Sequence, residues 1–484
     1  MTTLTWKINF DWTTAGTYDT RNDAKYATGL RVVRGRTQYI ANNGDGFEPM
    51  SPGYCSITLD NASGDYDPYN TGGALYPNVE PGKYVRVLVN TGGADIPVFA
   101  GRVESIDPTG GVSNPAVIIT AYDGLKQLKD TQITTSLHEN IRTGEAIDEI
   151  LSTAAQWPSV WSTRLESGAD IIPYWWENDV SAMDAIDRIS QAEFGGYAVL
   201  ADGTFRFKAR GLSSGEVATF DQSVMLKDIQ VPMPYNVVRN VIKVVVHPKV
   251  AQTTAALWTL QDKPYVAGSG SLEVWGNYTY EGRAVGAINT IQPVATTDYT
   301  MNTASDGTGT NLTANFSVTA TYFAETVKNV IENTGTTGGY VTLLKNRGQA
   351  IDTPDTSYVL VDTSGTNLKR TFIIDTPWMQ STTKAKQFAD YLTSVLSGVN
   401  KFPVFQMESQ PDYQFTPDLL DRVTVTISKY SINTSFRVGG IEHEWLTKNG
   451  QAVRTTVYTE PFVTQSAEDG YWYFPTTFTT KFPY

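Results

Sequence analysis

Alternation of apolar and polar positions runs through most of the chain and predicts β-strands. Branched aliphatic residues occupy every second position in short runs that Gly, Pro, Asn or Asp bound on either side. The clearest runs are residues 56–59, 84–89, 117–120, 241–246 and 422–427. Two further pairs of runs flank Asp202-Gly203 and Asn449-Gly450, dipeptides that tolerate the positive φ angles of a type I′ turn and so predict hairpins.

Only three segments have the 3.6-residue period of an amphipathic helix. They are residues 143–156, a segment that Ser181 opens, and residues 383–397. Ser181 and Asp184 have the spacing of a capping box, while Gly195 and Gly398 are placed to end the second and third helices. Each helix has one apolar face, so we expect each to pack against a sheet.

The middle of the chain changes in composition. Residues 251–347 are rich in Thr, Ala, Gly and Asn, and they contain strand-like runs of their own at 271–275, 315–320 and 339–344. A structureless loop of this length is uncommon in a compact domain, whereas whole domains are tolerated as insertions at surface loops. We therefore expect a β-sandwich inserted between two strands of a domain that resumes near Asp352.

A repeat relates the two ends of the chain at an offset of 338 positions, the distance from Val85 to Val423. In each copy, alternating branched residues are followed by eleven others and then by a glycine, a branched residue and a glutamate, which is Glu104 in the first copy and Glu442 in the second. Ordinary spacing in a β-meander could produce such a pattern. The unchanged spacing favours duplication, which would give one chain two similar barrels.

Several stretches resemble the hub proteins at the distal tail of tailed bacteriophages, both baseplate hubs of contractile tails and the hub regions of minor tail proteins at siphophage tail tips. These stretches are residues 29–35, 57–61 with 64–70, 75–77 and 81–87, 185–207, and 420–443. The resemblance covers most of the chain. It implies a mainly β fold of two tube-like β-barrel domains with a small α/β domain and an inserted β-sandwich.

With the patterns above, the resemblance predicts an order of domains. Barrel I covers residues 1–125, a small peripheral α/β domain 126–211, barrel II 212–250 and 351–460 with the helix 383–397, the inserted sandwich 251–350, and a docking tail 461–484. The implied role is a structural virion component, a homotrimeric hub that adapts a sixfold tail tube to a threefold tip. Implied partners are the distal tail or tail tube protein, a tip, spike or fibre protein, and the tape measure protein.

Composition narrows the functional class. The net charge of −13 argues against binding nucleic acid through its phosphates, but it suits the wall of a channel through which phage DNA passes without specific binding. Glu104 and Glu442 are the candidate channel-lining acids. The only cysteine, Cys55, excludes an intrachain disulfide. The chain shows no signal peptide and no apolar run near the ~18 residues of a membrane helix, so we expect synthesis in the host cytoplasm and a place in the virion.

The candidate chemistry is weak, so we expect no catalytic residues, cofactor or metal. The acidic cluster around Gly64 lacks the order of a calcium loop and favours turn chemistry. Its members are Asp60, Asn61, Asp65 and Asp67. The histidines are His138, His247 and His443, too few and too scattered for a convincing zinc or catalytic set. Because Glu442 and Glu444 share a strand face, a glycosidase pair stays the rival hypothesis.

Two aromatic clusters complete the list of candidates. The first, Trp157, Trp161, Tyr174, Trp175 and Trp176, favours core or interface packing over a sugar site. The second lies in the tail and supplies the possible interface aromatics Tyr471, Trp472, Tyr473 and Phe474, which we expect to dock on a neighbouring subunit or on the next protein of the assembly. The alternative function is a virion-associated glycan-binding protein or glycosidase.

Overall fold

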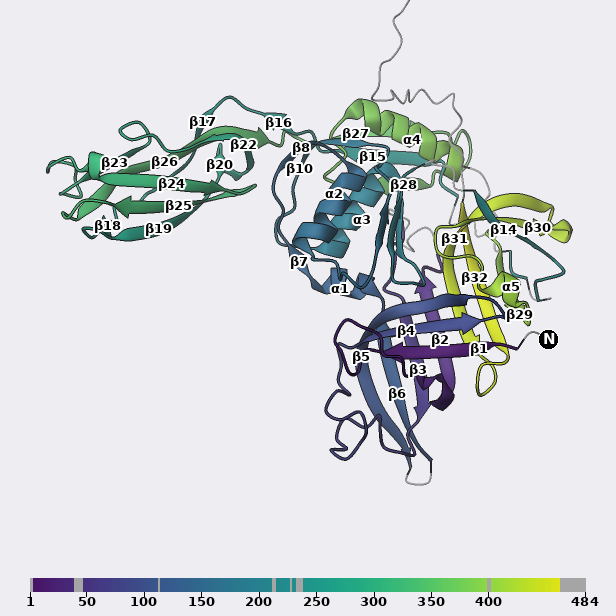
Figure 1. Cartoon of the computed structure of the whole chain (residues 1–484). Coiled ribbons are helices and arrows are strands. Elements are labelled where there is room, and N and C mark those ends of the chain that lie inside the picture. The colour runs from purple at the N-terminus through teal and green to yellow at the C-terminus, as the bar shows by residue number, and fades with distance from the viewer. Residues whose placement is uncertain are drawn as a thin grey trace, which may run out of the picture.

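The computed structural model describes residues 3–38, 47–111, 114–210, 215–226, 229–231, 238–397 and 402–461. Strands far outnumber helices, so the mainly β class expected from the alternation is confirmed (Figure 1). The tail aromatics expected at an interface, Tyr471, Trp472, Tyr473 and Phe474, and the expected helix stop at Gly398 lie outside the described residues.

The first barrel is built from six antiparallel strands. They are β1 (Thr5–Phe10), β2 (Ala27–Gly35), β3 (Tyr54–Asp60), β4 (Tyr84–Asn90), β5 (Asp95–Gly111) and β6 (Asn114–Tyr122), and they pair in the order β1-β4-β5-β6-β3-β2. Alternate side chains, among them Val32, Ile57, Val85 and Ile119, point inward and are fully buried in one core. The period of two in the sequence is therefore the period of burial.

The second barrel uses strands from both sides of the insert. They are β14 (Glu216–Asp221), β29 (Val404–Glu408), β30 (Arg422–Ile427), β31 (Ile432–Trp445) and β32 (Val453–Pro461), with the short helix α5 (Pro411–Gln414) before β30. They pair in the order β14-β30-β31-β32-β29, and Gln230 forms an antiparallel bridge with Val404 on the far side of β29. The turn between β31 and β32 has Asn449 and Gly450 both at positive φ, as the sequence predicts.

The small α/β domain holds two of the three predicted helices. Its elements are α1 (Gly124–Asp130), β7 (Gln132–Ile133), β8 (His138–Arg142), α2 (Thr143–Glu149) with a π turn at Ile150–Ala154, β9 (Thr163–Leu165), β10 (Ile171–Trp175), β11 (Val180–Ser181), α3 (Ala182–Glu193), β12 (Gly196–Val199) and β13 (Phe205–Lys208). The Ser181 hydroxyl accepts a hydrogen bond from the Asp184 amide, which is the predicted cap of α3. Within the described ranges no helix is long and apolar enough to cross a membrane.

One assignment made from the sequence differs from the structure. The strand at 241–246 and the helix at 383–397 were expected in barrel II, but they form a separate layer. Strand β15 (Val241–Val246) pairs with β27 (Ser357–Asp362) and β28 (Thr371–Ile374), and α4 (Thr382–Leu396) covers this sheet through a core of its own. The reason is that α4 buries a whole apolar face, and only a sheet outside the barrel wall offers a matching surface.

The insert is a β-sandwich, as expected, and it interrupts the chain between the paired strands β15 and β27. One sheet gathers β16 (Val250–Ala251), β17 (Ala255–Thr259), β18 (Tyr265–Val266), β22 (Gly286–Ile291) and β23 (Tyr299–Asn302) around β26 (Gly339–Asp352). The other is β19 (Ser271–Asn277), β25 (Thr326–Asn333) and β24 (Phe316–Tyr322), and a small hairpin joins β20 (Thr279–Tyr280) to β21 (Arg283–Ala284). In Figure 1 the insert projects away from both barrels.

A polar contact fixes the base of the insert to the α/β domain. The Glu325 carboxylate accepts hydrogen bonds of 2.7 Å each from Trp176 Nε1 and Asn178 Nδ2. Trp176 also packs with Ile288 and Ile351 of the insert in a small apolar cluster. The sandwich is therefore mounted on the α/β domain and not only tethered by its two connections.

Candidate assembly interface

The two barrels repeat one strand order. In barrel I the strands pair as β1-β4-β5-β6-β3-β2, and in barrel II as β14-β30-β31-β32-β29 followed by the Gln230 bridge. The strands of each barrel can be numbered along the chain, with the Gln230 segment counted as the second strand of barrel II. Both barrels then have the order first, fourth, fifth, sixth, third, second. The repeat inferred from two short motifs therefore extends to the whole strand order.

The hydrogen-bonded ladders also align the two copies residue by residue. In barrel I, Arg102 lies beside Tyr122, which lies beside Tyr54. In barrel II, Gly440 lies beside Tyr458, which lies beside Val404. Arg102 and Gly440 are thus equivalent, as the sequence offset predicts. Two positions further on, Glu442 lies beside Thr456, and the equivalent Thr120 lies beside Ser105 because β5 has a bulge between Val103 and Ser105. The bulge residues Glu104 and Ser105 together therefore take the place of Glu442.

The copies differ in two respects. Strand β1 is antiparallel to β4, whereas β14 is parallel to β30. The register between the fourth and fifth strands also differs, since Val85 lies opposite Gly101 while the corresponding Val423 lies opposite Phe436. The strand order is therefore repeated more faithfully than the register in which the strands pair.

The barrels are not separate bodies, because β2 of the first pairs directly with β31 of the second. This ladder runs antiparallel from Arg31 opposite Glu444 to Gly35 opposite Gly440. All strands of both barrels consequently belong to one continuous sheet (Figure 1). We call this β2–β31 ladder the barrel junction.

A buried ionic cluster closes one end of the barrel junction. Glu460 on β32 accepts hydrogen bonds from Arg36 Nε at 3.0 Å, from Arg36 Nη2 at 2.7 Å, and from Arg437 Nε at 2.7 Å. Burial alone would raise the pKa of Glu460, but the two guanidinium groups outweigh burial and hold that pKa below its ordinary value. The carboxylate is therefore charged, and it ties the end of β2 to the second barrel.

Gly35, the last residue of β2, lies where the two backbones approach most closely. Its φ of +79° is in the left-handed region, and a Cβ atom there would lie 2.2 Å from the Gly439 carbonyl oxygen. Both conditions require glycine at this position. The glycine that ends the 29–35 motif is thus explained by the barrel junction.

The structure separates the two acids that were expected to line a channel. Glu442 lies at the barrel junction, where its carboxylate accepts a 2.7 Å hydrogen bond from Arg31 Nε and its side chain is 20% exposed. Glu104 lies on β5 with 53% of its side chain exposed, and its nearest cation is Lys126 Nζ at 4.0 Å. Both point away from the barrel cores, but a basic group accompanies each acid, so this face carries mixed charge.

The acidic cluster around Gly64 forms side-chain-to-backbone hydrogen bonds within turns, as predicted. The side chains of Asp60, Asn61 and Asp67 accept hydrogen bonds from the backbone amides of Ala62, Tyr66 and Tyr69. Among the described residues, no group of three acidic, histidine or cysteine side chains is placed to hold a metal ion.

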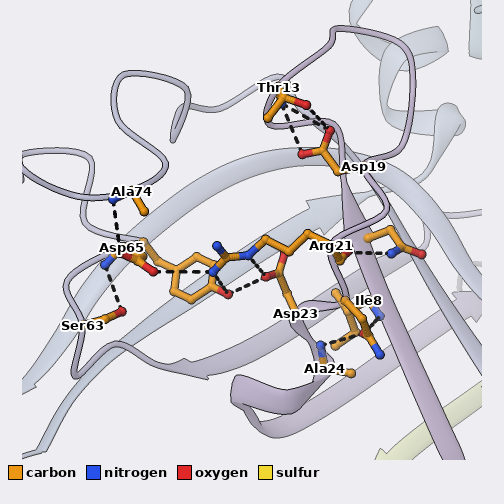
Figure 2. Close-up of polar contacts among 12 residues, drawn as sticks. Ile8, Thr13, Asp19, Arg21, Asp23, Ala24, Ser63, Asp65 and Ala74 are labelled. Atoms are coloured by element: carbon orange, nitrogen blue, oxygen red, sulfur yellow. Dashed lines mark hydrogen bonds and ion pairs between the residues drawn. The ribbon is translucent and has the colours of Figure 1, made fainter.

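Asp65 instead joins an ionic network that ties this loop to the N-terminal segment. Figure 2 shows the Arg21 guanidinium between Asp23 and Asp65, at 2.5 Å and 3.6 Å respectively. The Tyr66 hydroxyl donates to the fully buried Asp23 at 2.6 Å, and burial raises the pKa of Asp23 above its ordinary value. This network stabilises the fold of the loop.

The aromatic cluster of the α/β domain is core, the hypothesis that the sequence favours. Trp161, Trp175 and Trp176 are buried, and Trp175 and Trp176 both pack edge-on against Trp378. Such rings leave no exposed indole face on which a sugar could stack. The core hypothesis is confirmed for these three residues.

The histidines do not converge. Burial, and after it the charge of Arg34, lowers the pKa of His443 to about 3, and its Nδ1 lies 2.9 Å from the Thr455 hydroxyl. His247 pairs with Asp375 at 2.6 Å on the surface, and His138 lies against Trp175 in the α/β domain. A neutral buried histidine and two isolated ones do not make an acid–base centre.

The ionic groups at the barrel junction were missed in the sequence. Arg36 directly follows the 29–35 motif, but Glu460 falls at a polar position in the alternation of the last strand, and nothing local links two residues more than 400 positions apart. No local pattern marked these charged groups as a buried cluster.

Two barrels fused into one sheet, a small α/β domain and an inserted sandwich define a mainly β fold that solved tail proteins share. The chain aligns with the 43 kDa tail protein of prophage MuSo2 from Shewanella oneidensis over 94% of this chain and 98% of that one, with 10% identity and a TM-score of 0.50. It also aligns with the tail protein of Neisseria meningitidis MC58 over 94% and 96% of the two chains, with 9% identity and a TM-score of 0.49. At the level of the fold, the resemblance stated from the sequence is confirmed.

A third solved structure, prophage tail protein gp18 from Listeria monocytogenes EGD-e, aligns over 94% of each chain with 8% identity and a TM-score of 0.42. No protein-family model and no curated protein matches the sequence.

Proposed function

We propose that this chain is a structural component of the distal tail of a bacteriophage and works there as a homotrimeric hub. The observation that carries the proposal is the repeat of one strand order in two barrels of a single sheet. Three such chains supply six similar barrels, and contacts whose rotation closes produce a ring. A ring of this kind meets a sixfold tube on one side and a threefold tip on the other.

In this proposal the outward face of the continuous sheet, which carries Glu104 and Glu442, lines the channel. The net charge of −13 keeps a passing polyanion from binding the protein as a whole. Arg31 and Lys126 beside the two acids offset them locally, so the wall is weakly charged and not strongly repulsive. Proposed neighbours are the distal tail or tail tube protein, the tape measure protein, and a tip, spike or fibre protein. The role needs no catalytic centre.

The mass of the native protein in solution tests the hub directly. A trimer has three times the 53.2 kDa mass of the chain, which light scattering coupled to size-exclusion chromatography distinguishes from one or two copies. We expect the trimer, and negative-stain images of rings with six lobes. A monomer at micromolar concentration that also stays monomeric with its tail partners would overturn the proposal.

A second candidate function, glycan binding by the insert, is favoured by one exposed feature. Trp275 on β19 and Phe323 are 54% and 41% exposed, and their rings stack at 5.6 Å with an interplanar angle of 17°. Glu273 and Lys328 flank the pair and offer polar contacts at its rim. Exposed stacked rings with polar neighbours suit the faces of sugars.

A glycan array probed with the full chain tests this second function, with Phe323→Ala as the loss variant and Tyr265→Ala, an exposed aromatic elsewhere on the insert, as the control. We expect the first variant to abolish binding and the control to keep it. Equal binding by both variants would remove the site.

A further inference from the structure

One edge of β5 is open where the equivalent edge of β31 is filled. One edge of β31 is occupied by two strands in succession. Residues 432–437 pair with β30, and residues 440–444 pair with β2. On β5, the corresponding edge pairs with β4 up to Arg102, and Val103 donates to the Lys83 carbonyl and accepts from the Gly82 amide. Beyond Val103, the described part of the chain supplies no strand to this edge, although β6 pairs with the other edge on both sides of a bulge at Glu104.

From this asymmetry we infer that the open edge of β5 around Glu104 pairs with the Gln230 segment, residues 229–231, of a second copy of this chain. The inference rests on the proposed homotrimer. Within one chain, the second strand of barrel I fills the edge of the fifth strand of barrel II. In a ring, the second strand of barrel II fills the edge of the fifth strand of barrel I in the next subunit.

The ladders fix the register of this contact. Val33 of β2 lies beside Tyr54, in the row that ends at Arg102. Gln230 lies beside Val404, in the row that ends at Gly440, so Gln230 and Val33 are equivalent. At the barrel junction Val33 lies opposite Glu442, two positions beyond Gly440. Gln230 therefore lies opposite the bulge that takes the place of Glu442 on β5, which is Glu104 and Ser105 of the neighbouring subunit.

The local chemistry fits a strand partner at this place. Glu104 is exposed, and Gln230 is exposed on a segment that β29 holds by hydrogen bonds between the backbones of Gln230 and Val404. Pro108 on β5 has no amide hydrogen to donate, so pairing on this edge ends before it. The five paired residues of β31 correspond to residues 102, 103 and 105–107 of β5, with Glu104 as the extra bulge residue, and all of them precede Pro108.

Disulfide cross-linking tests the contact, because a disulfide needs Cα atoms within about 7 Å. The native chain is a clean background, since its one cysteine, Cys55, is fully buried. In Glu104→Cys/Gln230→Cys, each subunit offers one thiol to each neighbour. Mild oxidation with copper phenanthroline is expected to turn most of the protein into covalent dimers and trimers on non-reducing gels, reversed by reductant.

The matched control is Thr109→Cys/Gln230→Cys. Thr109 is exposed on the same strand but lies about 16 Å further along it, beyond the reach of a disulfide. A second pair at the same bulge, Ser105→Cys/Gln230→Cys, serves if the first double variant folds poorly. Cross-linking at 104/230 or 105/230 without cross-linking at 109/230 supports the contact.

The remaining outcomes separate the two claims. Variants that form trimers by light scattering under reducing conditions, yet give no cross-link at either pair, overturn the strand contact and leave the hub standing. Equal cross-linking at 109/230 overturns the register and with it the inference. A wild-type monomer overturns both the contact and the hub.

Discussion

Glu460→Gln tests the ionic cluster that closes the barrel junction. The substitution keeps the size of the side chain but removes the charge that Arg36 and Arg437 share through three hydrogen bonds of 2.7–3.0 Å. Glu460 is 2% exposed, so the guanidinium groups lose a buried partner, and breaking a buried pair from one side costs about 3–5 kcal/mol. We expect the free energy of unfolding to fall by that amount.

The assay is urea unfolding followed by tryptophan fluorescence at a fixed protein concentration, since assembly would shift the midpoint. Glu442→Gln is the control, because its ion pair with Arg31 joins the same two barrels but leaves the Arg31 side chain 52% exposed, and such pairs contribute less than about 1 kcal/mol. If Glu460→Gln costs no more than Glu442→Gln, the cluster does not hold the barrels together.

The effect of Glu460→Gln also has a defined pH dependence. The pKa of Glu460 is lowered in the folded protein, so its stabilisation is present above the ordinary value of 4.5 and is lost as the pH falls through the folded pKa. The difference between wild type and variant should therefore be full at pH 7 and shrink well below pH 4.5. A difference that stays constant down to pH 3 would show that the cost comes from packing and not from charge.

Three further predictions concern other parts of the fold. Gly35→Ala should cost about 3 kcal/mol or more in urea unfolding, because it adds a clash to the left-handed φ. Gly82→Ala, where φ is +89° and no atom lies near the added Cβ, should cost about 1–2 kcal/mol; equal costs would refute the crowding. Burial raises the pKa of Glu193 to about 7, so the wild-type protein should lose stability as the pH rises from about 4.5 through 7. Glu193→Gln should reduce that loss by up to about 3 kcal/mol. An unchanged pH profile of the melting temperature would contradict this prediction. Leu392→Ala in the apolar face of α4 should cost about 2–5 kcal/mol, against about 0.5 kcal/mol for the exposed Lys386→Ala; similar costs would mean that α4 is not packed as described.

Local patterns were sufficient for the elements themselves. Alternation located several strands of both barrels, among them β4 and β30, since burial in a sheet has the same period of two as the sequence. The cap at Ser181 and the apolar face of 383–397 placed α3 and α4 to within a residue or two. Helix α1, with only seven residues, was missed because two turns are too short to establish a period.

The repeat was visible in the sequence because a glycine, a branched residue and a glutamate keep their spacing in β5 and β31. Its meaning was not visible. The sequence placed Glu104 and Glu442 in equivalent positions, but only the structure shows that Arg31 pairs with one and that the edge beside the other is open.

The sequence by itself determined which segments are strands, where the insert begins and that the two ends of the chain repeat one motif, because each of these depends on neighbours within a few residues. Tertiary structure alone decided which sheet each strand joins. Strand β15 alternates as a barrel strand does, yet it pairs with β27 and β28, and β2 pairs with β31 more than 400 residues away. The backbone hydrogen bonds of a ladder are the same for every sequence, so the choice of partner depends on the surfaces that the completed domains bring together.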